Sequence, residues 1–307
     1  MAISGTASKL GGFGLALVVA FAAAYGVGQA VGPVAAEPEP AAAGHEGMSG
    51  ASGGSATHGT AHGTEVPKGL QVSADGLTLD VRGGGLRAGE RGDFAFRVLD
   101  ERGVPVTRFA PTHDKLMHLV VARRDLSGFR HVHPAMAADG TWRIPLTFAA
   151  AGDYRVFADF QAAGHDEGTT LGADVAVAGA YRPEPLPAPS RTATVAGYRV
   201  TLAGTLVPGT TSRLTLTVDR GGEPVTDLQP YLAAYGHLIA LRQGDLAYLH
   251  VHPDGEPGDG RTKPGPAITF FAEVPSAGTY RLYLDFQHGG VVRTAGFTAV
   301  AEPHEEK

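Results

Sequence analysis

The chain contains no cysteine among its 307 residues. This absence excludes disulfide bonds, zinc–thiolate and iron–sulfur sites, thiol catalysis and the blue-copper site, which needs a thiolate. The chain also lacks asparagine and therefore any N-glycosylation sequon. The formal net charge of −6 is mild and spread along the chain, without the basic patch of a nucleic-acid partner. Metal or catalytic chemistry must therefore come from other residue types, and the sequence has 13 histidines.

The N-terminal part carries the membrane signal of the sequence. An uncharged run, residues 10–36, follows Lys9, and its core at 13–25 is apolar. A bilayer span needs about 20 apolar residues, whereas a cleaved signal peptide has a shorter apolar region. We expect residues 1–36 to be an N-terminal transmembrane anchor; a signal peptide cleaved after 34–36 is the alternative. The protein is then a single-pass cell-membrane protein with its C-terminal part extracytoplasmic, or is secreted if cleavage occurs.

Residues 37–68 are rich in Pro, Gly, Ala and Ser and are expected to form a disordered linker. This segment holds four weaker candidates for metal ligands, namely His45, Met48, His58 and His62. Imidazole and thioether ligands together suit copper better than zinc. The segment is either a loose metal-collecting tract or a flexible tether with incidental histidines.

One histidine pattern occurs twice. His118 is followed thirteen residues later by the sequence His-Val-His-Pro at 131–134, and His237 is followed at the same distance by His-Val-His-Pro at 250–253. Three imidazoles at the same spacing in two copies indicate a possible metal chemistry. The comparison is internal to this chain.

The duplication extends well beyond the histidines. Residues 105–134 match 224–253 without a gap, and a second matching block follows at a slightly larger offset. Such a repeat predicts two copies of one domain. We place the domains and the segments around them at 69–179 for repeat 1, 180–191 for a Pro-rich hinge, 192–301 for repeat 2 and 302–307 for the tail.

Each repeat alternates apolar and polar residues with a period of two, as half-buried strands do. The predicted strands of repeat 1 are 77–81, 94–98, 116–122, 131–133, 141–146, 154–160 and 173–177. Those of repeat 2 are 198–202, 214–218, 237–241, 247–252, 269–273, 280–286 and 296–300. About seven short strands in roughly 110 residues indicate an all-β fold of two tandem immunoglobulin-like β-sandwich domains.

The candidate metal ligands are His118, His131 and His133 in repeat 1 and His237, His250 and His252 in repeat 2. Residues i and i+2 of a strand point to the same face, so each His-x-His pair projects side by side. Whether His118 joins the first pair depends on one residue of register, which the sequence leaves open. With His118 opposite His133, three imidazoles converge as in copper or zinc sites with an open position.

Further side chains near the pattern are weaker ligand candidates: His113, Met117, His165 and His288. Asp159 and Asp285, at equivalent positions of the two repeats, are candidates to accept a histidine N–H and orient the ring. Copy two has Leu232, Ala233 and Gly236 where copy one has His113, Asp114 and Met117, so two metal sites would be unequal.

The His-x12-His-x-His-Pro core, with the strand Tyr-Arg-x-Phe/Tyr-x-Asp-Phe that follows it, resembles bacterial exported proteins of the YtkA-like/FixH-like kind. Such proteins look like small immunoglobulin-like β-domains, often attached to a membrane segment, and some occur near copper handling or oxidase assembly. The likeness covers each repeat and carries over to the six repeat histidines only.

We therefore expect a membrane-anchored, exported protein that binds a transition-metal ion, copper first and zinc second, through three histidines per repeat. A membrane or cell-surface protein is a further expected partner, and nucleic acid is not. One alternative is a cell-surface structural or protein-interaction module whose histidines bond internally. A second is a zinc-dependent hydrolase, which needs a carboxylate beside the open position; the sequence favours a binding protein over an enzyme.

Overall fold

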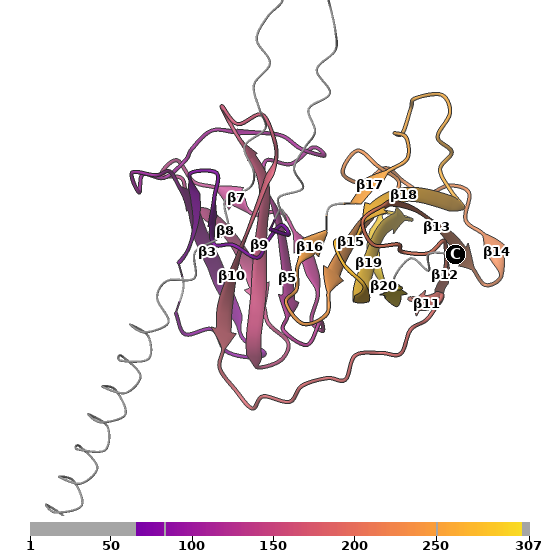
Figure 1. The fold of residues 1–307 in the computed structure, drawn as a ribbon, viewed down its shortest axis with the longest axis horizontal. Coiled ribbons are helices and arrows are strands. Elements are labelled where there is room, and N and C mark those ends of the chain that lie inside the picture. Colours follow the sequence, from indigo (N-terminus) through magenta and orange to yellow (C-terminus); the bar gives the residue numbers. More distant parts are fainter. Residues whose placement is uncertain (1–65, 83, 250, 303–307) are drawn as a thin grey trace, which may run out of the picture. The chain divides into compact units, whose positions relative to one another are not determined.

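The computed structural model describes residues 66–82, 84–249 and 251–302, all within the unit His62–Lys307. The expected anchor, the linker candidates His45, Met48, His58 and His62, and the ligand candidate His250 lie outside the described residues. The described part consists of strands and loops (Figure 1). Within it, no helix is long and apolar enough to cross a bilayer.

Repeat 1 forms two antiparallel sheets. In the β3 sheet the order is β1-β2-β3-β8-β7, and in the β5 sheet it is β10-β9-β5-β6, with β4 paired to β9. Figure 1 shows β3 and β8 in one layer and β5, β9 and β10 in the other. The strands are β1 (Ser73–Ala74), β2 (Leu77–Arg82), β3 (Arg91–Leu99), β4 (Phe109–Ala110), β5 (His118–Arg123), β6 (Arg130–Val132), β7 (Ala135–Met136), β8 (Trp142–Thr147), β9 (Gly152–Ala162) and β10 (Thr169–Val177).

Repeat 2 forms the same pair of layers. Its β13 sheet has the order β11-β12-β13-β18-β17, with β14 paired to β13, and its β15 sheet has the order β16-β15-β19-β20. The strands are β11 (Thr192–Val195), β12 (Tyr198–Ala203), β13 (Thr211–Arg220), β14 (Glu223–Pro224), β15 (His237–Arg242), β16 (Tyr248–Leu249), β17 (Val251–Pro253), β18 (Ala267–Glu273), β19 (Gly278–His288) and β20 (Val291–Ala301).

The all-β, tandem immunoglobulin-like fold that the sequence predicts is confirmed. Alternating burial along β12 and β18 shows why these strands form, since one face covers the core and the other faces water. Both repeats also contain a tyrosine corner: the Tyr154 hydroxyl donates to the Ala150 carbonyl at 2.9 Å, and the Tyr280 hydroxyl to the Ser276 carbonyl at 2.8 Å. This bond, four residues back along the chain, is a hallmark of immunoglobulin-like sandwiches.

Strand β5 differs from that pattern because all six of its residues are buried. Leu119 and Val121 belong to the core of repeat 1, whereas Val120 and Ala122 belong to a second apolar cluster on the other face of the sheet. That cluster also takes residues from β15 and β19 of repeat 2, including Ile239, Leu241 and Tyr283, together with Leu126 and Leu246. Strands β5 and β15 are therefore covered on both faces.

The Pro-rich hinge contributes to the same contact. The backbone N–H of Glu184 donates to the Asp125 carboxylate at 2.7 Å, and Leu186 packs against the apolar cluster. Asp125 also pairs with the buried Arg123 guanidinium at 2.6 Å, which helps to hold the pKa of this carboxyl at about 2 despite its burial. The hinge is thus bonded to repeat 1 at Glu184.

Candidate metal centre

The register between β5 and β6 decides which histidines meet. Leu119 lies opposite Val132 and Val120 opposite His131, so His118 is next in line to face His133. Opposed residues of an antiparallel pair share a face, and so do residues i and i+2, which puts all three imidazoles on one face. One ring nitrogen from each of His118, His131 and His133 lies within 4.8 Å of the other two, and among the described residues this is the one such group.

Protein acceptors fix two of these rings in a definite tautomer. His118 Nε2 lies 2.9 Å from the Thr112 carbonyl oxygen, which only accepts hydrogen bonds, so Nε2 carries a proton. His131 Nδ1 lies 2.9 Å from a carboxylate oxygen of Asp285, so Nδ1 carries a proton there. The remaining nitrogens, Nδ1 of His118 and Nε2 of His131, carry lone pairs in the neutral rings.

Those two lone pairs point at each other. His118 Nδ1 lies 3.1 Å from His131 Nε2 and 3.2 Å from His133 Nε2. Nitrogen ligands at 2.0–2.1 Å from a tetrahedral ion lie about 3.3–3.4 Å apart. Two of the three nitrogen–nitrogen distances in the triad of His118, His131 and His133 are therefore close to an edge of a tetrahedral site, and the third is within 4.8 Å. Three protein ligands would leave one position of such a site open.

The triad is largely removed from water. His118 is 5% exposed, and the side chains of His131 and Asp285 are each 4% exposed. Burial lowers the pKa of His118 to about 4, although the hydrogen bond to the Thr112 carbonyl opposes this change. Burial, followed by the repulsion of the neighbouring imidazoles, lowers the pKa of His133 to about 3. Both rings are therefore neutral, as metal ligands must be, across the physiological range.

Three more rings surround the triad. His113 lies 6.2 Å from His118, His237 lies 6.3 Å from His131, and Tyr231 lies 6.2 Å from His133, measured between ring centroids. His113 is in the left-handed region, with φ of 48°, in the two-residue turn before β5. The triad is therefore bordered by imidazole and phenol rings from both repeats.

The second copy of the histidine pattern is arranged differently. His237 is buried on β15 and its Nε2 donates to the Tyr231 and Leu232 carbonyls at 3.0 and 2.9 Å, as His118 does to Thr112. His252, however, is exposed and lies on β17, which pairs with β18 of the other sheet. In repeat 2 the chain enters the other sheet at Val251, which corresponds to Val132 of repeat 1. In repeat 1 it enters the other sheet only at Ala135, three residues later. With His250 outside the described residues, a second three-His cluster stays a prediction.

The weaker candidates occupy other places. Met117 is buried in the core of repeat 1, on the opposite face from His118, so its sulfur is directed away from the triad. Both ring nitrogens of His288 are bonded, Nδ1 to the Tyr198 hydroxyl at 2.7 Å and Nε2 to Asp227 at 3.0 Å. His165 lines a groove of about 590 Å³ beside residues 66–75.

Of the two candidate orienting carboxylates, Asp285 bonds a triad histidine of the other repeat. Asp159 accepts from the Thr170 hydroxyl at 3.0 Å and from the Tyr248 hydroxyl at 3.5 Å. The sequence indicates both aspartates as candidates, but it does not predict that Asp285 bonds a histidine of the other repeat. The sequence also does not predict the bond from His118 to the Thr112 carbonyl, because every residue has a backbone carbonyl.

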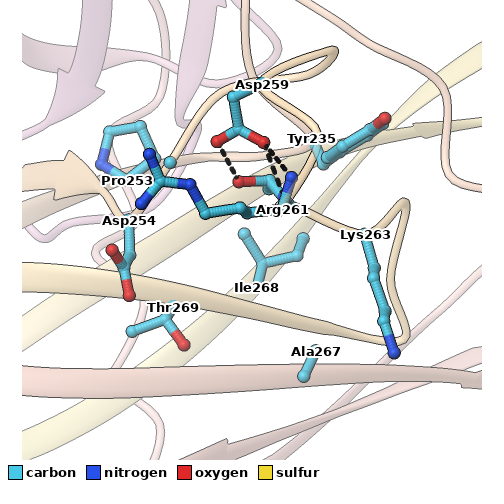
Figure 2. A pocket seen from close by; sticks show the side chains of 11 residues that line it. Tyr235, Pro253, Asp254, Asp259, Arg261, Lys263, Ala267, Ile268 and Thr269 are labelled. Atoms are coloured by element: carbon cyan, nitrogen blue, oxygen red, sulfur yellow. Dashed lines mark hydrogen bonds between the residues drawn. The ribbon is translucent and has the colours of Figure 1, made fainter.

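The longer loop of repeat 2, at residues 254–266, forms part of a separate pocket of about 350 Å³ (Figure 2). The Asp259 carboxylate accepts the backbone N–H of Glu256, Arg261 and Thr262 and the Thr262 hydroxyl, at 2.7–3.2 Å. These hydrogen bonds, led by the Thr262 backbone N–H, hold the pKa of Asp259 below its ordinary range. None of the residues lining this pocket is a histidine, so the loop is separate from the triad.

One family model matches the chain twice, over residues 71–178 and 193–303. The chain belongs to the family described as a domain of unknown function, DUF8832. Each copy of the DUF8832 domain corresponds to one sandwich. This match leaves the finer resemblance to YtkA-like/FixH-like proteins as a prediction. None of the curated proteins matches the chain.

Several solved structures of immunoglobulin-like proteins are similar to the DUF8832 repeats at low identity. Invasin, titled a bacterial integrin-binding protein, is 16% identical, with 73% of this chain and 39% of that chain covered and a TM-score of 0.21. InvD of Yersinia pseudotuberculosis is 12% identical, with 75% and 58% covered and a TM-score of 0.25. A putative membrane-anchored protein of Corynebacterium diphtheriae is 11% identical, with 76% and 60% covered and a TM-score of 0.23. The chain thus spans less than two thirds of these proteins, and the similarities carry no argument about function.

Proposed function

We propose that this protein binds one transition-metal ion, copper first and zinc second, at His118, His131 and His133. The observation that carries the proposal is the pair of lone pairs on His118 Nδ1 and His131 Nε2, which face each other at 3.1 Å because Thr112 and Asp285 hold the other two nitrogens. Lone pairs at that distance repel unless a positive charge, a metal ion or a proton, lies between them. Because the pKa values of His118 and His133 are low, these rings do not take up an extra proton near neutral pH. A metal ion is therefore favoured over a proton as the positive charge.

The donor set indicates which ions fit. Three neutral imidazoles suit zinc and copper, and the general affinity order places Cu²⁺ above Zn²⁺. Calcium and magnesium prefer oxygen ligands and are disfavoured here. When bound, the metal would keep an open position for water or a small ligand.

The hydrolase alternative has less support. It requires a carboxylate near the open position to handle a proton. The oxygens of Asp285 already accept from His131 at 2.9 Å and from the Thr294 hydroxyl at 2.5 Å. We therefore propose metal binding or exchange, in an exported protein anchored by residues 1–36, rather than catalysis.

The test is a copper and zinc titration of the full chain in detergent, counting the ions retained against a competing chelator. His133→Ala should remove one tightly held ion. His252→Ala is the matched control, since the same substitution at the equivalent position of repeat 2 alters an exposed side chain on another sheet. An unchanged number of retained ions in His133→Ala, or no tightly held ion in the unaltered chain, would refute the proposal.

A further inference from the structure

The metal centre of repeat 1 has one part that repeat 1 does not supply. His131 and Asp285 are 154 positions apart along the chain and belong to different sandwiches, yet His131 Nδ1 and the carboxylate are 2.9 Å apart. Both side chains are 4% exposed. A buried, charge-assisted hydrogen bond of this kind determines which ring nitrogen carries the proton.

The carboxylate is itself held in place. Asp285 lies opposite His237 in the register of β15 and β19, and its Oδ1 accepts from the Thr294 hydroxyl of β20 at 2.5 Å. Its Oδ2 is left for His131. Repeat 2 thus presents one fixed oxygen to the first histidine of the His-x-His pair in repeat 1.

We infer that Asp285 is a positioning residue for the metal centre of the other repeat, so that metal affinity in repeat 1 depends on contact with repeat 2. The inference rests on the proposed metal binding. By accepting from Nδ1, Asp285 leaves the lone pair of His131 on Nε2, directed toward His118 and His133. Coupling between two binding events is reciprocal. If contact between the repeats raises metal affinity by a given factor, the bound metal raises the equilibrium constant for that contact by the same factor.

An Asp285→Asn substitution tests this role with little change of shape. The Thr294 hydroxyl keeps the amide oxygen on its own side, so the amide NH₂ faces His131 Nδ1 and forces this nitrogen to accept. His131 Nε2 then carries the proton and donates to His118 Nδ1, which removes the facing lone pairs in the metal-free chain. The metal-free variant should therefore keep or raise its melting temperature while binding metal less well.

The experiment uses the full chain with zinc ions as the probe. Asp285→Asn should weaken zinc binding about 10- to 100-fold, the usual effect of removing a carboxylate that orients a histidine ligand. Nitrogen-15 NMR of labelled histidine should show His131 protonated at Nδ1 in the unaltered chain and unprotonated at Nδ1 in the variant. In a His131→Ala background, Asp285→Asn should cause no further loss of affinity.

Tyr283→Phe is the matched control, because it removes another hydrogen bond between the repeats, from the Tyr283 hydroxyl to the Leu126 carbonyl, without contacting a triad histidine. Zinc affinity should change less than about threefold in this variant. Unchanged zinc affinity in Asp285→Asn, a His131 that keeps its Nδ1 proton, or an equal loss in the His131→Ala background would overturn the inference. Failure of the unaltered chain to bind zinc through the triad would refute the proposed function instead, and the NMR signal of His131 would still report the bond to Asp285.

Discussion

His133 and His252 hold equivalent positions in two copies of one pattern, yet His133 follows β6 of the β5 sheet and His252 lies on β17 of the β13 sheet. His133 Nε2 is 3.2 Å from His118 Nδ1, whereas His252 lies exposed on the sheet opposite to that of His237. The cause is the position at which the chain leaves the β15 sheet, three residues earlier than in repeat 1. A small difference in strand length thus puts the candidate ligand His252 on a different sheet from His237.

The metal-free protein should lose stability as the pH falls from about 6.5 to about 4. Burial lowers the pKa of His118 and of His237 to about 4 from the ordinary histidine value of 6.5. The unfolded chain therefore takes up protons below pH 6.5 that the folded chain does not take up until near pH 4. The free energy of unfolding from denaturant titrations should be flat above pH 7.5 and fall in this window. His237→Gln should make that slope shallower, and an unchanged slope would contradict the assignment.

Met117 should matter for stability and not for metal affinity. Its side chain is 1% exposed and packs in the core of repeat 1. Met117→Leu conserves volume and should cost less than about 1.5 kcal/mol of unfolding free energy, while Met117→Ala should cost about 2–5 kcal/mol. Copper affinity of Met117→Leu, measured by chelator competition, should equal that of the unaltered chain. A loss as large as that of His133→Ala would make the sulfur a ligand.

The apolar cluster shared by the two repeats should contribute as much as an ordinary core. Leu246 is fully buried in that cluster and Leu116 is 41% exposed. Leu246→Ala should lower the unfolding free energy by about 2–5 kcal/mol, and the matched Leu116→Ala by less than about 0.5 kcal/mol. Denaturant titration of the full chain measures both. Equal effects would show that contact between the β5 and β15 sheets contributes nothing to stability.

Much of the fold follows from the alternation of apolar and polar residues. The predicted strand 198–202 corresponds to β12 (Tyr198–Ala203), and 280–286 lies within β19 (Gly278–His288). The predicted strand 247–252 instead divides into β16 and β17, which belong to different sheets. Alternation does not reveal this change, because residues on both sides of it are apolar and either sheet can bury them.

The candidate site was less accessible to sequence reasoning. The spacing of His131 and His133 indicates a shared face, but the position of His118 depends on the turn between β5 and β6, where Leu126 takes a left-handed conformation with φ of 66°. A leucine gives no sign of such a turn. The bond from His131 to Asp285 depends on packing between two domains, for which strand patterns carry no information.

The cross-repeat bond gives the order of the two copies a meaning that their sequence likeness hides. Copy one supplies the three imidazoles and copy two supplies the anion that orients one of them. Two genes each encoding one sandwich would not reproduce this arrangement unless the products associated as the fused copies do. A three-residue difference in the position at which the chain changes sheets makes two similar halves unlike. A chimaera carrying copy one twice would have six ligand candidates and a different interface between the repeats.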